Sequence, residues 1–153
     1  MPWVRNIFIV TADQKPKWLD ENAHSKIKLI NHSQIIDAKY LPTFNSHVIE
    51  ANLYKIPDLS EHFIYFNDDI FVARPLMPNH FFENNGLASL FVANKSFQKM
   101  RQRGLITPTL TASEHALKLL KRHYPTININ TPLVHTYVPL RKTSFQKAWS
   151  CRN

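Results

Sequence analysis

Two stretches indicate the fold class of this chain: Val4–Val10 (VRNIFIV) and His62–Phe66 (HFIYF). Both are short apolar runs rich in β-branched and aromatic residues, which is typical of buried strands. Ile27–Ile30 (IKLI) and Leu87–Ala93 (LASLFVA) have the same character. Helical patterns separate these runs. Their alternation predicts an α/β domain with a mostly parallel sheet and flanking helices.

Turn and cap signals predict a short helix start at Lys15–Leu19 and helices at His47–Ile56, Ser113–Tyr124 and Pro139–Trp149. Ser113 is the expected N-cap of the third helix, whose Leu117 and Leu120 would pack against the sheet. Pro139 suits the first turn of the last helix. Lys95–Gly104 is polar and basic, which predicts a surface loop or linker. The change of character near Asn94 divides the chain into an α/β core at residues 1–94 and a basic helical segment at residues 95–153.

Length and composition exclude several classes of protein. The 153 residues fit one domain or part of a larger one, and 44% are hydrophobic, which argues against disorder. No apolar run approaches the roughly 20 residues of a membrane span. A single cysteine, Cys151, excludes an internal disulfide and a cysteine-built metal site. Only two glycines, Gly86 and Gly104, are present, so a glycine-rich phosphate loop is excluded.

Charge is distributed unevenly along the chain. Residues 1–94 carry eight basic and ten acidic side chains, whereas residues 95–153 carry eleven basic ones and a single acid, Glu114. The basic part indicates an anionic partner such as nucleic acid, a phosphorylated sugar or a membrane surface, or else a solvated face. A non-catalytic nucleic-acid-binding module is therefore a rival hypothesis. The chain lacks a recognisable nucleic-acid motif, so we expect no nucleic-acid partner.

Asn67-Asp68-Asp69 is the sharpest local signal for chemistry. These residues interrupt an apolar run, and carboxylates at the carboxyl end of a strand often hold Mg²⁺ or Mn²⁺ that bridges a diphosphate. The alternative is an ordinary Asn/Asp turn. Glu50, in the second predicted helix, is either a functional acid or a solvated side chain. His135 is either a hydrogen-bonding residue at a helix end or an acid–base group.

Arg141 and Lys142 follow His135, near the start of the last predicted helix. A phosphate group would suit this position, although each side chain taken singly fits a solvated face equally well. The eight histidines show no HExxH or other tight ligand spacing, which argues against a histidine-built zinc site.

These motifs resemble the second conserved region of the Stealth family in five blocks that keep the family's order: Pro2–Thr11, Pro16–Leu19, Leu41–Glu50, Ile56–Phe63 and Tyr65–Phe71. His135–Lys142 (HTYVPLRK) is similar to the family's third conserved region. The family includes bacterial capsular polysaccharide phosphotransferases and an animal N-acetylglucosamine-1-phosphotransferase. Its first and fourth conserved regions have no counterpart here. The resemblance therefore implies the middle portion of a longer enzyme, an incomplete domain of glycosyltransferase-A-like fold.

The resemblance implies a reaction and roles for particular residues. A hexose-1-phosphate would move from a UDP-sugar to a hydroxyl of an acceptor sugar in capsular polysaccharide synthesis, with release of UMP. The implied catalytic residues are Glu50, Asp68 and His135, and Asp68 and Asp69 would bind Mg²⁺ or Mn²⁺. The implied substrate-binding residues are Asn45, Ser46, Arg74, Arg141 and Lys142.

The same resemblance sets the partners and the location. It implies a nucleotide-sugar donor, a saccharide acceptor and a cytoplasmic location, with peripheral association with the capsule assembly machinery at the inner face of the membrane. Two alternatives remain open. One is a glycosyltransferase of similar fold, which would release UDP, and the other is an inactive fragment of the phosphotransferase.

Overall fold

The computed structural model describes residues 1–20, 25–105 and 107–150, and by packing the chain divides into two compact units. The first unit comprises Met1–Tyr65, Phe71–Ala88 and Pro139–Asn153, and the second comprises Phe66–Ile70 and Ser89–Val138. The boundary expected between residues 94 and 95 rests on composition and motifs and stays a prediction. No helix within the described residues is long and apolar enough to cross a membrane.

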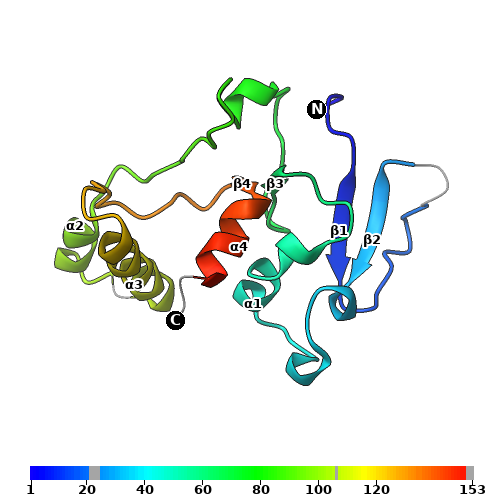
Figure 1. Ribbon diagram of the computed structural model, residues 1–153, viewed down its shortest axis with the longest axis horizontal. Coiled ribbons are helices and arrows are strands. Elements are labelled where there is room, and N and C mark those ends of the chain that lie inside the picture. The colour runs from blue at the N-terminus through cyan, green and yellow to red at the C-terminus, as the bar shows by residue number, and fades with distance from the viewer. Residues whose placement is uncertain (21–24, 106, 151–153) are drawn as a thin grey trace. The chain divides into compact units, whose positions relative to one another are not determined.

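Two parallel strands open the first unit. β1 (Ile7–Thr11) pairs with β2 (Ile27–Asn31) in a register that places Ile9 opposite Leu29 and Thr11 opposite Asn31. Figure 1 shows the two arrows side by side and pointing the same way. Both predicted strands and their parallel pairing are therefore confirmed.

The core of the first unit forms beside this strand pair. The buried side chains are Ile30, Ile35, Ile36, Leu53 and Ile56. Half-buried apolar residues from β1, the first helix and the next strand pack against them, among them Phe8, Ile49 and Phe63. Burial of a side chain of this size contributes roughly 1.5–3 kcal/mol, so this cluster is the main source of the unit's stability.

A second sheet replaces the expected extension of the first one. β3 (His62–Tyr65) pairs with β4 (Val138–Arg141) in a separate two-stranded sheet. The backbone N–H of Lys142, just after β4, donates to the carbonyl of Glu61, just before β3. The prediction of one mostly parallel sheet is therefore wrong for the described residues. The fold is instead a small mixed α/β arrangement. The prediction failed because the pairing of β4 with β3 is a long-range contact, which no local pattern encodes.

The same pairing corrects the last predicted helix. Pro139 is buried within β4, and α4 begins only at Lys142 and runs to Ser150. Phe145 of α4 packs against Tyr54 and Phe63, with ring centroids 5.9 Å and 6.1 Å apart. These contacts fix α4 against the first unit's own core.

The helix expected over His47–Ile56 is divided into two pieces. α1 covers Ser46–Glu50, and a 3-10 turn covers Leu53–Lys55. Asn52 explains the break, because its side-chain amide donates to the carbonyl of Val48 at 2.8 Å, a carbonyl that a continuing α-helix would bond to a backbone N–H. The helix expected at Lys15–Leu19 is instead a turn, closed by a bond from the Leu19 N–H to the Pro16 carbonyl.

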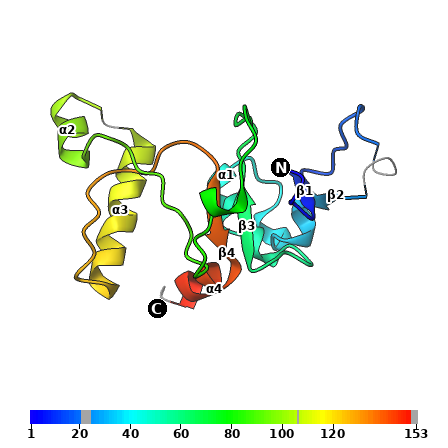
Figure 2. The same ribbon diagram turned by 90° about the horizontal axis from the view of Figure 1, so that it is seen from above.

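The second unit contains two helices, α2 (Phe97–Gln102) and α3 (Pro108–His123), which lie beside each other in both ribbon views (Figures 1 and 2). α2 falls within Lys95–Gly104, where a loop was predicted. Its formation follows from Ser96, whose hydroxyl caps the helix by accepting from the Lys99 N–H. Prediction of a loop there was wrong because the cap outweighs the polar composition.

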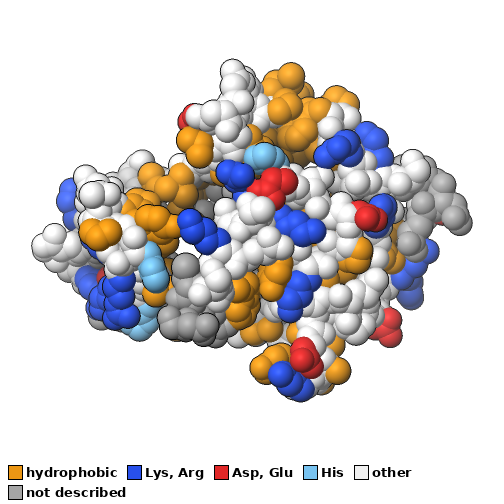
Figure 3. Space-filling view, in the orientation of Figure 1, with side chains coloured by type: hydrophobic (Ala, Val, Ile, Leu, Met, Phe, Trp, Pro, Cys, Tyr) orange, Lys and Arg blue, Asp and Glu red, His pale blue; other side chains and the backbone are white. Residues whose placement is uncertain are grey.

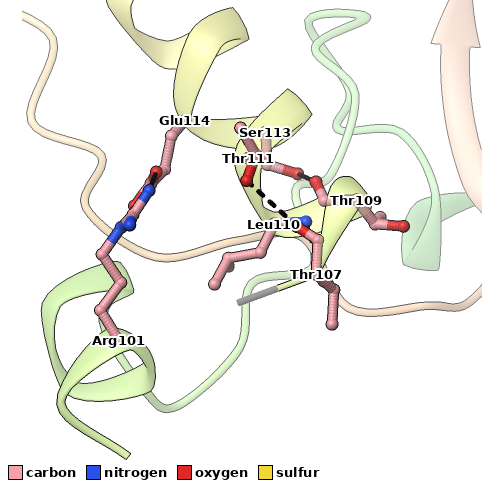
Figure 4. Close-up of polar contacts among 7 residues, drawn as sticks. All are labelled: Arg101, Thr107, Thr109, Leu110, Thr111, Ser113 and Glu114. Atoms are coloured by element: carbon pink, nitrogen blue, oxygen red, sulfur yellow. Dashed lines mark hydrogen bonds and ion pairs between the residues drawn. The ribbon is translucent and has the colours of Figure 1, made fainter. Parts of the chain in front are cut away.

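The start of α3 also differs from the prediction. Thr107 is the N-cap, since its hydroxyl accepts from the Leu110 N–H at 3.1 Å, and Pro108 occupies the first turn (Figure 4). Ser113 lies inside the helix and donates to the carbonyl of Thr109. Leu110 is buried, whereas Leu120, expected in the packed stripe, is 41% exposed.

Leu87–Ala93 is not a strand. It contributes only isolated bridges, of Ala88 with Phe82 in the first unit and of Val92 with Leu133 in the second. The bridge at Val92 is extended by backbone hydrogen bonds that join Phe91 to Val134 and Ala93 to Pro132. The apolar run therefore lies along the segment that leads to His135, without forming a regular ladder.

Candidate active site

Glu50 is fixed by the end of β3. It is the last residue of α1, and its Oε1 accepts a hydrogen bond from the Tyr65 hydroxyl at 3.0 Å. Both side chains are half-buried, and Tyr65 is the last residue of β3. The contact holds the carboxylate in place, and within the described residues it engages only one of the two carboxylate oxygens.

A tight turn follows β3 and presents two carboxylates to solvent. The Asn67 side-chain oxygen accepts from the Asp68 N–H at 2.9 Å, and the Asn67 carbonyl accepts from the Ile70 N–H. Asp68 and Asp69 are both exposed. Within the part of the chain that the structure describes, the Asp68 carboxylate has no hydrogen-bond partner. The Asn/Asp turn expected as the alternative to a functional site is thus present, and the Asp68 carboxylate is exposed on it.

Asp69 contacts His135. The Nε2 atom of His135 lies 3.1 Å from both carboxylate oxygens of Asp69, and the side chains are 65% and 63% exposed. An ion pair so exposed contributes little to stability. A carboxylate at this distance does, however, orient an imidazole ring and select which nitrogen carries the proton.

Aromatic packing brings these two residues together. Phe66 lies three positions before Asp69, and Tyr137 lies two positions after His135. Their ring centroids are 5.6 Å apart, and Tyr137 also meets Phe91 edge-on at 5.4 Å. Aromatic pairs of this geometry contribute about 0.5–1.5 kcal/mol each beyond their buried area. The cluster therefore positions the carboxylate and the imidazole within the second unit.

Two of the predicted substrate-binding residues form the start of α1. Asn45 is its N-cap and accepts from the His47 N–H at 3.0 Å, and the Ser46 hydroxyl lies 3.3 Å from the His47 ring nitrogen Nδ1. Asn45 therefore has a structural role whatever its part in binding. Arg74 is exposed, on the chain that follows the acidic turn.

Arg141 and Lys142 lie at the junction of β4 and α4, where both contact Glu61. The Arg141 Nε atom donates to Glu61 Oε1 at 3.1 Å, and the Lys142 N–H donates to the Glu61 carbonyl at 2.8 Å. The Thr143 hydroxyl and N–H also donate to the Glu61 carboxylate. The Thr143 hydroxyl bond, followed by the Thr143 N–H and Arg141, lowers the pKa of Glu61. Glu61 therefore stays ionised and fixes this junction.

The predicted site residues fall in two groups. Asp68, Asp69 and His135 belong to the second unit, which brings Asp69 and His135 together. The first unit holds Glu50, Asn45, Ser46, Arg74, Arg141 and Lys142. That the two groups face one cleft stays a prediction.

The donor set at the acidic turn fits a hard divalent cation. Among residues 1–20, 25–105 and 107–150, no group of three or more His, Cys, Asp or Glu side chains is placed to hold a metal ion. Mg²⁺ is commonly held by one or two carboxylates together with substrate phosphates. The free carboxylate of Asp68 and the adjacent Asp69 suit that mode of binding.

Sequence reasoning gave no role to Tyr65 or Glu61, although both lie in the motifs that carry the family resemblance. Tyr65 contacts a residue 15 positions away and Glu61 one 80 positions away. No local pattern signals either contact. The only hints in the sequence are a tyrosine at the end of an apolar strand motif and an acid just before that motif.

The chain belongs to the Stealth family. The family model described as Stealth protein CR2, conserved region 2, matches residues 1–90, which is more than half of the chain. The chain is also 98% identical over 150 residues to a capsular polysaccharide phosphotransferase of Neisseria meningitidis serogroup B, a match that covers 98% of this chain and 40% of that protein.

Two further relatives show how the similarity extends. A capsular polysaccharide phosphotransferase of Actinobacillus pleuropneumoniae is 64% identical over 97% of this chain and 40% of its own length. An exopolysaccharide phosphotransferase of Streptomyces coelicolor is 50% identical over 60% of this chain and 15% of its own length. The chain thus spans about two fifths of the length of the capsular relatives that it matches.

Proposed function

We propose that the chain supplies the reacting groups of a phosphotransferase of capsular polysaccharide synthesis. A hexose-1-phosphate would pass from a UDP-sugar to a hydroxyl of a saccharide acceptor, which forms a phosphodiester and releases UMP. The observation that carries the proposal is the contact of His135 Nε2 with both oxygens of Asp69 in a member of the Stealth family. The names of the capsular relatives support the same class of reaction.

The proposed chemistry begins at His135. With the proton of neutral His135 on Nε2, directed at Asp69, the Nδ1 atom is an acceptor. Nδ1 would take the proton of the acceptor hydroxyl while that oxygen attacks the sugar-bearing phosphorus. The bond from this phosphorus to the oxygen of the UMP leaving group breaks in the same in-line displacement. General-base assistance of this kind is worth about 10²–10⁴ in rate.

The remaining residues would position substrate and balance charge. Asp68 and Asp69 would hold Mg²⁺ or Mn²⁺, which neutralises diphosphate charge when bound. Glu50, held by Tyr65, would orient the acceptor sugar through hydrogen bonds to its hydroxyls. Asn45, Ser46, Arg74, Arg141 and Lys142 would contact the donor and its phosphates.

The proposal extends to a whole protein of the length of the capsular relatives, of which this chain covers 40%. A glycosyltransferase-A-like domain, a cytoplasmic location and a peripheral position at the inner membrane face are parts of it that the family resemblance implies. Fractionation of cells into cytosol, membrane and periplasm, with and without a high-salt wash, tests the location.

Product analysis tests the reaction itself. The full-length Neisseria relative, 98% identical in this region, is incubated with a radiolabelled UDP-sugar and an oligosaccharide acceptor. Release of UMP, with the phosphate label retained in the product, is the expected result. Release of UDP would assign a glycosyltransferase instead. The 153-residue chain assayed in parallel distinguishes an active portion from an inactive fragment.

A further inference from the structure

A cleft lies between α2 and α3 in the second unit, away from the residues described above. Its volume is about 540 Å³, within the range of small-molecule sites. The α3 side of the cleft is formed by Glu114, Leu117, Lys118 and Lys121. Their spacing of three and four positions places them on one face of the helix. That face is turned toward α2, yet it carries three charged residues and one apolar residue.

The cleft has a surplus of positive charge. Arg101 of α2 forms a two-point ion pair with Glu114, with its Nε atom 2.7 Å from Glu114 Oε1 (Figure 4). The hydrogen bonds from Arg101 lower the pKa of Glu114, and Lys118 adds a smaller effect in the same direction. Among the described residues, Glu114 is the only acid that lines the cleft, and Arg101 neutralises it. Lys118 and Lys121 are therefore the cations left to meet a ligand. Figure 3 shows Lys and Arg side chains gathered over the part of the surface where α3 lies.

Uncharged hydrogen-bonding groups line the same cleft. Gln98 of α2 and Asn130 contribute side-chain amides that form no hydrogen bond within the described part of the chain. The Asn130 carbonyl accepts from the Phe97 N–H at 3.0 Å, which fixes the Asn130 backbone against α2. Amides can both donate to and accept from hydroxyl groups. Two cations beside two amides suit a ligand that carries a negative charge and several hydroxyls.

We propose that the cleft between α2 and α3 binds a phosphodiester-linked saccharide, with Lys118 and Lys121 on the phosphate and Gln98 and Asn130 on the sugar hydroxyls. The saccharide part of this inference rests on the proposed function, whose product is a sugar phosphodiester, whereas the cleft and its charge do not. The site would retain the growing polymer between transfers as a second binding site for the product chain.

The lining favours a saccharide over a nucleic acid. Binding of single-stranded nucleic acid relies on exposed aromatic rings that stack on the bases. Among the described residues that line the cleft, Phe97 is the only aromatic one, and it is only 9% exposed. At that exposure its ring offers little surface for stacking.

Titration calorimetry on the 153-residue chain at fixed ionic strength tests the inference. The probes are a synthetic oligosaccharide joined by sugar 1-phosphodiester bonds, the same sugars joined without phosphate, and single-stranded DNA of equal charge. We expect the phosphodiester oligosaccharide to bind about tenfold more tightly than either of the other probes. The double variant Lys118→Gln/Lys121→Gln should lose about tenfold in affinity, since charge-assisted contacts to phosphate are the strong ones.

Matched variants separate the cleft from overall charge and from catalysis. The double variant Lys99→Gln/Arg122→Gln removes the same two charges from α2 and α3 outside the cleft lining, and it should change the affinity less than about twofold. Unchanged binding by Lys118→Gln/Lys121→Gln, or DNA binding that depends equally on Lys118 and Lys121, would overturn the inference. Asp69→Asn should retain binding, so a failure of the proposed transfer reaction is read separately, from product analysis in the full-length relative.

Discussion

The Nε2 atom of His135 lies 3.1 Å from each carboxylate oxygen of Asp69, although 66 positions separate the two residues in the chain. The rings of Phe66 and Tyr137 meet beside this contact and hold the two segments together. Because both polar side chains are well exposed, the contact is of little value for stability and stays accessible to a substrate. This combination is compatible with the role proposed for His135.

Replacing His135 tests its role as the base. His135→Gln in the full-length Neisseria relative should lower the rate of UMP release by about 10²–10⁴, because the group that accepts the hydroxyl proton is lost. The measurement is initial rate at saturating donor across a range of pH. His123→Gln, an exposed histidine at the end of α3, is the matched control. Near-normal rates in His135→Gln would leave the residue without a chemical role.

The two adjacent carboxylates are expected to respond differently to substitution. Asp68→Asn should mainly raise the Mg²⁺ concentration needed for half-maximal activity, because among the described residues the Asp68 carboxylate has no hydrogen-bond partner. Asp69→Asn should lower the turnover number, since the group that orients His135 is altered. Both variants should keep the thermal stability of the parent, since both side chains are exposed. Identical kinetic effects of the two would contradict this division of roles.

Glu50 and Tyr65 allow structure and chemistry to be separated. Tyr65→Phe removes the hydroxyl that donates to Glu50 and should cost about 0.5–1.5 kcal/mol of unfolding free energy in urea. Glu50→Gln keeps an oxygen that can accept this bond, so it should remain near parental stability. Its transfer activity should nevertheless fall, because a carboxylate is lost. A stable and fully active Glu50→Gln would show that Glu50 serves the fold alone.

Glu61 should make stability depend on pH. Its pKa in the folded chain is lowered, first by the Thr143 hydroxyl bond, so the folded state binds its proton less readily than the unfolded state. The stabilisation is therefore present above the unfolded pKa and is lost as pH falls through the folded pKa. Chemical denaturation at about pH 7 and about pH 3 should show a larger difference between parent and Glu61→Gln at the higher pH. An equal difference at both values would exclude this effect.

The N-cap of α3 can be located by substitution. Thr107→Ala removes the hydroxyl that accepts from the Leu110 N–H and should cost about 1 kcal/mol. Ser113→Ala, at the position that sequence analysis assigned to the cap, should cost nothing or stabilise slightly, because alanine favours a helix interior. Helical ellipticity and the urea midpoint measure both changes. The reverse order of effects would restore the cap at Ser113.

Several strands and one helix could be predicted from the local sequence pattern, whereas other elements could not. β1, β2 and β3 were predicted because each is an apolar run dense in residues of high β propensity, and α3 because its residues keep helical spacing. β4 was missed because Pro139 usually marks a helix start or an edge, and only pairing with β3 made this segment extended. The break after Glu50 was missed because the Asn52 side chain competes with the backbone for the Val48 carbonyl.

Residue identity and short spacing were enough to predict which residue types carry chemistry, the family and the acidic turn after β3. Three contacts appear only in the folded chain: β3 pairs with β4, Tyr65 donates to Glu50, and Asp69 contacts His135. Each of these contacts joins segments 15 or more positions apart. The free energy of such a contact comes from packing and hydrogen bonds that exist only once both segments are folded, so no local pattern can specify it.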